Sequence, residues 1–252
     1  MSKNFELMQQ IDRDFEATSL PGPSPVVSRR HEKVPLNGTS RDLSRVAHEE
    51  ILKLVQQIFF LQTDKAPRTI VFAGVDSGTD CRQICLPVAE TLKSVVSGSV
   101  CIVEADFRSP SLTGSLGSTS HRGLTDALLT EGPVRPLAKA LKTDNLWLLS
   151  RGVLAPDSPN LLNGDRIRVR FAELRDEFDY LIVSAPSLTD YADATALGGL
   201  SDGVVLVLEA NSTRKDTAFK VINNLRAATI EVLGAVLNNR TYPIPEWLYR
   251  RL

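Results

Sequence analysis

Six short apolar segments, separated by stretches with helical spacing, constrain the fold of this chain most strongly. Each is apolar at successive positions rather than at alternate ones, which indicates strands buried on both faces. Such strands form parallel sheets, whose crossover connections are usually helices that cover both sides of the sheet. We therefore predict an α/β fold, a three-layer sandwich with a mostly parallel sheet and helices on both faces. The predicted strands are Ile70–Ala73, Val100–Val103, Leu146–Leu149, Tyr180–Val183, Gly203–Leu208 and Val232–Leu237.

The connections between these strands carry apolar residues at helical spacing, so most of them are predicted to be helices. The predicted helical ranges are 40–60, 83–95, 124–129, 161–177 and 213–228. The carboxyl ends of parallel strands meet at one edge of a sheet, and ligands of such sheets bind there. We expect the loop 74–78, Asp106 and Ser184 to converge at that edge.

The segment Thr69–Gln83 is a buried strand, a loop with two glycines and the start of a helix. This is the layout of a phosphate-binding loop, in which backbone N–H groups and a helix N-terminus hold an anion. A working loop has Lys after its last glycine, then Ser or Thr as a magnesium ligand, and neither residue type stands there in this chain. The cofactor-binding positions of this degenerate loop are Gly78, Thr79, Asp80, Cys81, Arg82 and Gln83.

The composition argues against several other classes of protein. The 252 residues include 29 Lys and Arg against 30 Asp and Glu, so the net charge gives no reason to propose a nucleic-acid partner. No apolar run approaches the roughly 18 residues of a membrane span, and the N-terminus lacks the apolar core of a signal peptide. The cysteines Cys81, Cys85 and Cys101 have no metal-ligand spacing and predict no disulfide framework. We therefore expect a cytoplasmic protein.

The two ends of the chain differ in composition from its middle. Residues 1–16 have the apolar spacing of a short amphipathic helix, and 19–40 have the Pro, Gly and Ser content of a linker. We divide the chain into this N-terminal helix with a flexible linker (1–40) and one domain (41–252). Docking of the helix on a partner and simple fraying are equally open. Residues 241–252 combine Tyr242 and Tyr249 with prolines and apolar side chains, which favours a docking tail.

The order of several motifs resembles that of the bacterial tyrosine kinases of capsule and exopolysaccharide biosynthesis, P-loop proteins related to the partition and septum-site ATPases. Residues 103–112 (VEADFRSPSL) resemble the family's V-D-A-D-x-R-x-P-x-L, and residues 123–128 (GLTDAL) resemble its G-L-S-D-x-L. Residues 178–186 (FDYLIVSAP), followed by Asp193, resemble its Y-D-Y-x-I-I-D-T-P. The match covers nearly the whole chain and implies a P-loop NTPase-like sandwich.

The resemblance also locates the departures of the phosphate loop. In the family's P-G-x-G-K-S/T only the first glycine is kept, as Gly78. Asp80 brings a carboxylate to the place of a polyphosphate, and Cys81 lacks the lysine charge. Arg82 has no acceptor with which to bind Mg²⁺.

The acidic motifs of the family are altered as well. Ser184 stands at the Walker-B position, where the family has an aspartate. The resemblance makes Glu104 and Asp106 the metal-binding candidates, and Asp106 the vestigial catalytic residue. Because the phosphate, metal and metal-anchor positions change together, the set argues against ordinary ATP·Mg catalysis. We expect no cofactor or a weakly bound one.

Several residues of the predicted site keep two interpretations. Arg82 is an exposed first-turn arginine, which we favour, or a substitute for the lysine. Cys81 is an inert thiol, which we favour, or a reactive one at a helix start. For Asp106 and Arg108 two interpretations have equal weight: they contact a metal ion and a phosphate, or they form a salt bridge within the loop. Asp193 caps a helix, the more common use, or orients a water.

The helix 40–60 also has two interpretations. Glu50, Lys53 and Gln56 fall where the family has an E-x-x-R-x-x-R helix used in ring-shaped oligomers. Only Glu50 matches fully, so a conventional packed helix is slightly favoured.

The leading functional hypothesis is a pseudokinase that acts as a regulatory or scaffolding component of exopolysaccharide or capsule polymerisation and export. The alternative is an active ATP-dependent protein tyrosine autokinase with an atypical nucleotide site that uses ATP and Mg²⁺, and Tyr242 and Tyr249 are its candidate phosphosites. A partition-type switch ATPase is disfavoured because that group also needs the lysine. The expected partner is a membrane polysaccharide co-polymerase that controls chain length, or a cognate kinase, with a homo-oligomer as a further option. Such a partner would hold the protein peripherally at the inner membrane.

Overall fold

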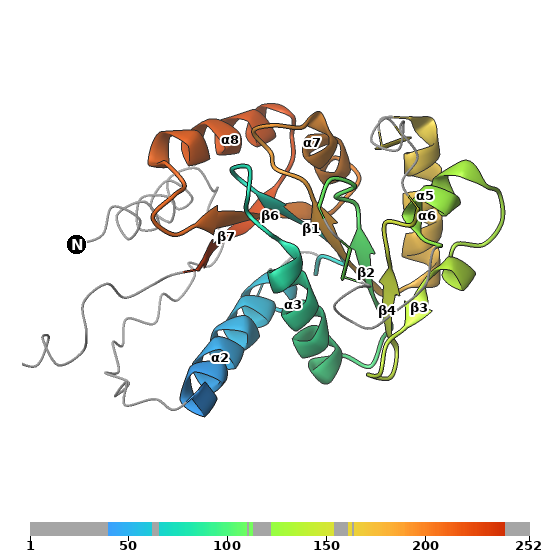
Figure 1. Ribbon diagram of the computed structural model, residues 1–252, viewed down its shortest axis with the longest axis horizontal. Helices are drawn as coiled ribbons and strands as arrows, with labels where there is room; N and C mark the ends of the chain where they lie inside the picture. The colour runs from blue at the N-terminus through green and yellow to red at the C-terminus, as the bar shows by residue number, and fades with distance from the viewer. Residues whose placement is uncertain are drawn as a thin grey trace, which may run out of the picture.

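A central β-sheet organises the protein, as the computed structural model shows (Figure 1). The structure describes residues 40–61, 66–109, 111–112, 122–153, 161–162 and 164–239, and the backbone alone within 40–47. In these ranges the sheet has seven strands in the order β3-β4-β2-β5-β1-β6-β7. The strands are β1 (Thr69–Gly74), β2 (Val100–Glu104), β3 (Lys139–Ala140), β4 (Leu146–Leu149), β5 (Tyr180–Ala185), β6 (Gly203–Glu209) and β7 (Val232–Asn238).

Every strand pair except one is parallel, so the predicted mostly parallel sheet is confirmed. All six predicted strands are present. The exception is β3, which runs antiparallel to β4 at the edge of the sheet and was not predicted. Its two residues, Lys139 and Ala140, are both exposed, and an edge strand of this kind leaves no apolar pattern in the sequence.

Helices cover both faces of the sheet, as predicted (Figure 1). One face is covered by α2 and α3. The other face is covered by α5, α6, α7 and α8. The helices are α2 (Ser40–Phe59), α3 (Arg82–Val95), α5 (Leu124–Leu129), α6 (Asp165–Glu177), α7 (Ala192–Gly198) and α8 (Lys215–Ala227), with a short 3₁₀ helix η1 at Arg135–Leu137. Among the described residues no helix has the length and apolar content needed to cross a membrane.

The two faces of β1 show why its sequence is apolar at every position. Ile70 and Phe72 pack into the cluster beneath α2 and α3. Val71 and Ala73 point the other way, into the cluster beneath α6, α7 and α8. Because successive side chains of a strand point to opposite faces, only a strand covered on both sides buries all of them.

Two helix predictions differ from the structure. The helix predicted over 161–177 begins at Asp165, because Gly164 is extended (φ −91°, ψ 169°) and interrupts the helical backbone. The helix α7 was not predicted; it is seven residues long and rich in alanine, so it has little apolar periodicity to detect. This omission matters because α7 carries Asp193, and the loop before it reaches the functional site.

Candidate functional site

The loop 74–78 and Asp106 converge at the carboxyl ends of the strands as predicted, whereas Ser184 does not line the cavity between them. β1 lies beside β5, and β5 lies beside β2, so the loops that follow these three strands meet. They enclose an open cavity of about 330 Å³, called the loop cavity below. Its lining residues are Ser77, Gly78, Thr79, Asp80, Arg82, Asp106, Arg108, Ser109, Pro186, Ser187, Asp190 and Tyr191.

The loop after β1, predicted to have the layout of a phosphate-binding loop, has a compact backbone. Gly78 has φ +92°, a left-handed conformation that glycine adopts without strain. A Cβ added to Gly74 would lie 2.8 Å from the Thr79 Cβ, so the loop closes tightly on the end of the strand. Two buried oxygens, Asp76 Oδ2 and Thr79 Oγ1, have no hydrogen-bond partner within the described ranges, which is uncommon for buried polar atoms.

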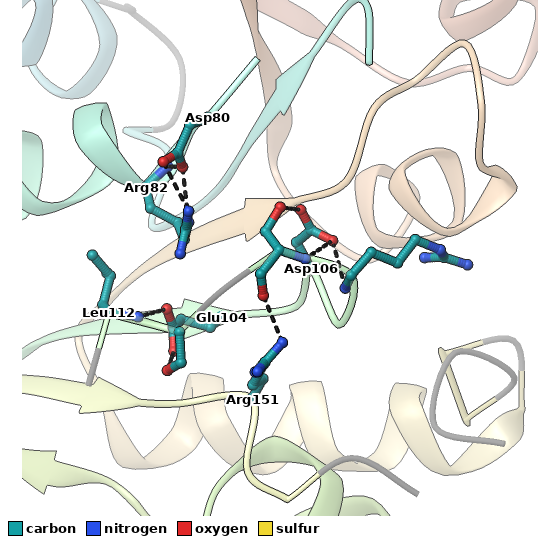
Figure 2. A network of polar contacts seen from close by, with 9 residues as sticks. Asp80, Arg82, Glu104, Asp106, Leu112 and Arg151 are labelled. Atoms are coloured by element: carbon teal, nitrogen blue, oxygen red, sulfur yellow. Dashed lines mark hydrogen bonds and ion pairs between the residues drawn. The ribbon is translucent and has the colours of Figure 1, made fainter. Parts of the chain in front are cut away.

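Asp80 and Arg82 bond to each other inside this loop (Figure 2). Oδ1 of Asp80 accepts the backbone N–H of Arg82 at 3.1 Å and its Nε–H at 2.8 Å, while Oδ2 accepts Nη2–H at 2.8 Å. The Arg82 side chain is only 14% exposed and lines the loop cavity. The prediction of an exposed first-turn arginine was therefore wrong, because the neighbouring carboxylate folds the guanidinium back onto the loop.

Cys81, at the position of the lysine, points into the protein. It is 3% exposed and packs in the cluster beneath α2 and α3. Burial raises the pKa of the Cys81 thiol to about 12, and the charges of Asp106 and Asp80 act in the same direction. The interpretation as an inert thiol fits this environment, since the thiolate is the nucleophilic form.

Ser184 and Gln83 lie outside the loop cavity. Ser184 is buried within β5, where it faces the thiol of Cys85. Burial raises the pKa of Cys85, and a hydrogen bond with Ser184 only partly opposes that rise. Gln83 is exposed in the first turn of α3. Of the six predicted cofactor-binding positions, Gly78, Thr79, Asp80 and Arg82 line the cavity.

The two metal candidates have separate roles in the structure (Figure 2). Asp106 accepts the backbone amides of Arg108 and Ser109 and the Ser109 hydroxyl, which fixes the turn after β2. Glu104 is buried and accepts the Ser111 hydroxyl at 2.5 Å and the Leu112 amide at 2.6 Å. Only Asp106 lines the cavity, and the described residues contain no group of three or more His, Cys, Asp or Glu side chains placed to hold a metal ion.

The loop after β2 is also held from outside the cavity. Arg151 donates from Nη1 to the carbonyl of Ser109 at 2.6 Å and to that of Phe107 at 3.4 Å. No motif in the sequence had pointed to Arg151. It follows β4 by two positions, so its place at the carboxyl edge of the sheet was the available signal.

Arg108 connects this loop to α7. Its Nη1 donates to Asp193 Oδ2 at 2.7 Å, and its guanidinium lies 3.7 Å from the centre of the Tyr191 ring. Asp193 is not the helix cap that we expected, because Tyr191 is the N-cap residue and Asp193 lies in the first turn. Arg108 is thus salt-bridged, but to α7 rather than to Asp106. Tyr191 and Asp190 were missed, although they follow the fourth predicted strand.

Two predictions about α2 and the ends of the chain have different outcomes. α2 packs on α3 through Val55, Ile58 and Phe59, as a conventional packed helix does. Glu50 and Lys53 form an exposed ion pair, and a role in a ring-shaped oligomer stays a prediction. The N-terminal helix, the linker and the tail with Tyr242 and Tyr249 lie outside the described residues.

The sheet order, the loop after β1 and the cavity beside it define a P-loop NTPase-like protein. The chimerical protein CapA2B2 has this fold, with a TM-score of 0.70 and 20% identity over 77% of this chain and 85% of that one. The kinase domain of Escherichia coli tyrosine kinase ETK has a TM-score of 0.66 and 18% sequence identity, over 88% of this chain and 88% of that one. A ParA family ATPase from Chlorobium tepidum has a TM-score of 0.57 and 16% sequence identity, over 69% of this chain and 74% of that one.

Sequence comparison narrows the class. The tyrosine-protein kinase YwqD of Bacillus subtilis is 24% identical over 76% of this chain and 81% of its own length. The tyrosine-protein kinase wzc of Salmonella typhi is 24% identical over 77% of this chain but 27% of its own length. The succinoglycan biosynthesis transport protein ExoP of Rhizobium meliloti is 26% identical over 54% of this chain and 18% of its own length. No protein-family model matches the chain. The chain is similar in sequence to bacterial tyrosine-protein kinases and shares their fold, in line with the resemblance of its motifs.

Proposed function

We propose that this protein works in the assembly of a capsule or exopolysaccharide, as a pseudokinase that regulates or scaffolds polymerisation and export. The polysaccharide context comes from the relatives, since ExoP is named for succinoglycan biosynthesis and transport. The proposed partner is a membrane polysaccharide co-polymerase or a cognate kinase. Such a partner would bring the chain to the membrane from the cytoplasmic side.

The loss of phosphoryl transfer is supported above all by one observation: the residue at the lysine position is a buried, neutral thiol. Cys81 brings no positive charge to the loop cavity, because its high pKa keeps the thiol protonated at neutral pH. A triphosphate held by the loop would lack the charge-assisted contact that lysine normally makes.

The residues present do not fit a magnesium–nucleotide complex. The hydroxyl that should bind magnesium is replaced by Arg82, whose guanidinium has only donors. The Walker-B position holds Ser184, which is buried beside Cys85 rather than exposed to the cavity. Glu104 is occupied in anchoring the loop after β2.

The second candidate function is an active tyrosine autokinase with an atypical nucleotide site. The names of the relatives support this candidate more directly than the first, because YwqD and wzc are both called tyrosine-protein kinases. The loop cavity supports it as well, since Arg82 and Arg108 lie in its wall and two loop oxygens lack partners among the described residues. In this function the two guanidinium groups would hold the phosphates that lysine holds elsewhere.

A titration of the full chain with ATP and Mg²⁺ separates the two candidates. We expect no heat of binding in calorimetry at micromolar protein and no transfer of labelled phosphate to the chain. Micromolar binding that Asp106→Ala abolishes, together with labelled phosphotyrosine, would establish the autokinase instead. An active relative treated in the same way serves as the positive control.

A further experiment concerns the tail. We expect that Tyr242 and Tyr249 stay unmodified when the chain is co-expressed with an active kinase of the same polysaccharide system, because we propose that the tail docks. Mass spectrometry of the tail peptides gives the readout. Stoichiometric phosphorylation at either tyrosine would make this chain a substrate rather than a docked partner.

A further inference from the structure

The carboxylate of Asp80 takes up hydrogen-bond donors at the start of the loop helix. It accepts the backbone N–H of Arg82, the first residue of α3, and two further bonds from the Arg82 guanidinium. Backbone N–H groups at the start of the loop helix are the ones that hold a phosphate in a working loop. Here a side chain of the loop itself satisfies the first of them.

The charges around the loop cavity do not favour a polyphosphate. Three carboxylates line it, from Asp80, Asp106 and Asp190, against the two guanidinium groups of Arg82 and Arg108. Arg82 is bonded to Asp80, and Arg108 is bonded to Asp193 on α7. An incoming polyphosphate therefore meets cations that are already paired, in a cavity whose lining has an excess of negative charge.

We propose that Asp80 determines the anion specificity of the loop cavity. It acts as a built-in anion that keeps Arg82 and the N-terminus of α3 from polyphosphates, and its removal opens the loop to them. This inference rests on the proposed loss of nucleotide binding and gives its local cause. The Gly78 turn and the close contact between Gly74 and Thr79 do not involve the Asp80 side chain, so we expect both to remain when it is replaced.

The test measures how tightly full-length variants bind inorganic pyrophosphate, and ATP without Mg²⁺, by calorimetry. Asp80→Asn removes the charge and keeps the shape, while Asp80→Gly also allows the close backbone approach that phosphates need. We expect Asp80→Gly to bind pyrophosphate at least about tenfold more tightly than the natural chain, a gain of the size that charge-assisted hydrogen bonds provide. Asp80→Asn should also bind pyrophosphate more tightly than the natural chain, but by a smaller factor than Asp80→Gly.

Two controls separate this effect from a general change in charge. Asp190→Asn also removes one carboxylate from the cavity wall, but Asp190 is not bonded to Arg82, so its gain should be less than about twofold. Adding Arg82→Ala to Asp80→Gly should cancel most of the gain, because the freed guanidinium is then absent. Thermal melting of each variant verifies that it is folded.

The proposal is wrong if folded Asp80→Gly and Asp80→Asn bind pyrophosphate no better than the natural chain, or if Asp190→Asn gives an equal gain. The two proposals fail in different measurements. Tight ATP binding by the natural chain would refute the proposed function, and the ratio between Asp80→Gly and the natural chain would still test the role of Asp80.

Discussion

Arg108, in the turn after β2, and Asp193, in the first turn of α7, lie 85 residues apart in the sequence and meet at 2.7 Å beside the loop cavity. Asp193 is 5% exposed and Arg108 is 30% exposed, so the pair is half-shielded from water. The contact joins the turn after β2 to the first turn of α7. It thereby sets the position of one cavity wall relative to the other.

Removing this arginine should cost more stability than its surface position suggests. Arg108→Ala removes the guanidinium that pairs with the buried carboxylate of Asp193, and we expect a loss of about 1–3 kcal/mol in the free energy of unfolding. Asp193→Asn should cost less, because it leaves no buried charge behind. Urea denaturation measures both. Equal losses for the two variants would contradict this explanation.

A methyl group at Gly123 should disrupt the packing of α5 against the strand end beside it. A Cβ at this position would lie 2.1 Å from the Ser150 carbonyl oxygen and 2.5 Å from the Gly152 nitrogen. Because backbone atoms must move to make room, we expect Gly123→Ala to lower the unfolding free energy by about 3 kcal/mol or more. Gly234→Ala is the matched control, since no atom lies within 4 Å of its added Cβ. Thermal melts that shift equally for both variants would refute the clash.

The stability of the protein should fall in acid. Hydrogen bonds from the Ser99 amide and hydroxyl hold the pKa of Asp179 below its usual value. Partial burial pushes the pKa of Asp202 upward, but bonds from the amides of Arg68 and Thr69 and from Arg175 outweigh it and leave a net lowering. Because both carboxylates have lower pKa values when folded than when unfolded, they stabilise the fold above about pH 4 and lose that effect below it.

Urea denaturation between neutral pH and about pH 3 measures this dependence. Asp179→Asn should flatten the decline, since the amide cannot titrate. If the free energy of unfolding of Asp179→Asn fell with pH as steeply as that of the natural chain, Asp179 would not contribute to the acid sensitivity.

The three cysteines should be unreactive in the folded protein. Cys81, Cys85 and Cys101 are all buried, and burial raises the pKa of each thiol, to about 12 for Cys81 and Cys101. A thiol-specific disulfide reagent at neutral pH should therefore modify none of them quickly, and all three after denaturation in urea. Rapid modification of Cys81 alone would support the other interpretation, that Cys81 is a reactive thiol at the start of a helix.

The strands and their surroundings could be predicted because each one is apolar at successive positions. That pattern has few solutions other than a parallel sheet covered on both faces, and the location of the site follows from the direction of the strands. β3 and α7 escaped prediction for the opposite reason. Lys139 and Ala140 are exposed, and α7 is short and rich in alanine, so neither segment carries a periodic apolar signal.

The sequence by itself determined the α/β class, the phosphate-loop layout and the absence of lysine at its functional position, because these depend on residue type and order along the chain. The tertiary structure alone decided the partners of the charges. In the wall of the loop cavity Arg82 turns back to Asp80 and Arg108 crosses to Asp193, while Glu104 lies outside the cavity and holds Leu112. The physical reason is that ion pairs and hydrogen bonds depend on distances of a few ångströms between side chains, and only the packed fold brings those atoms together.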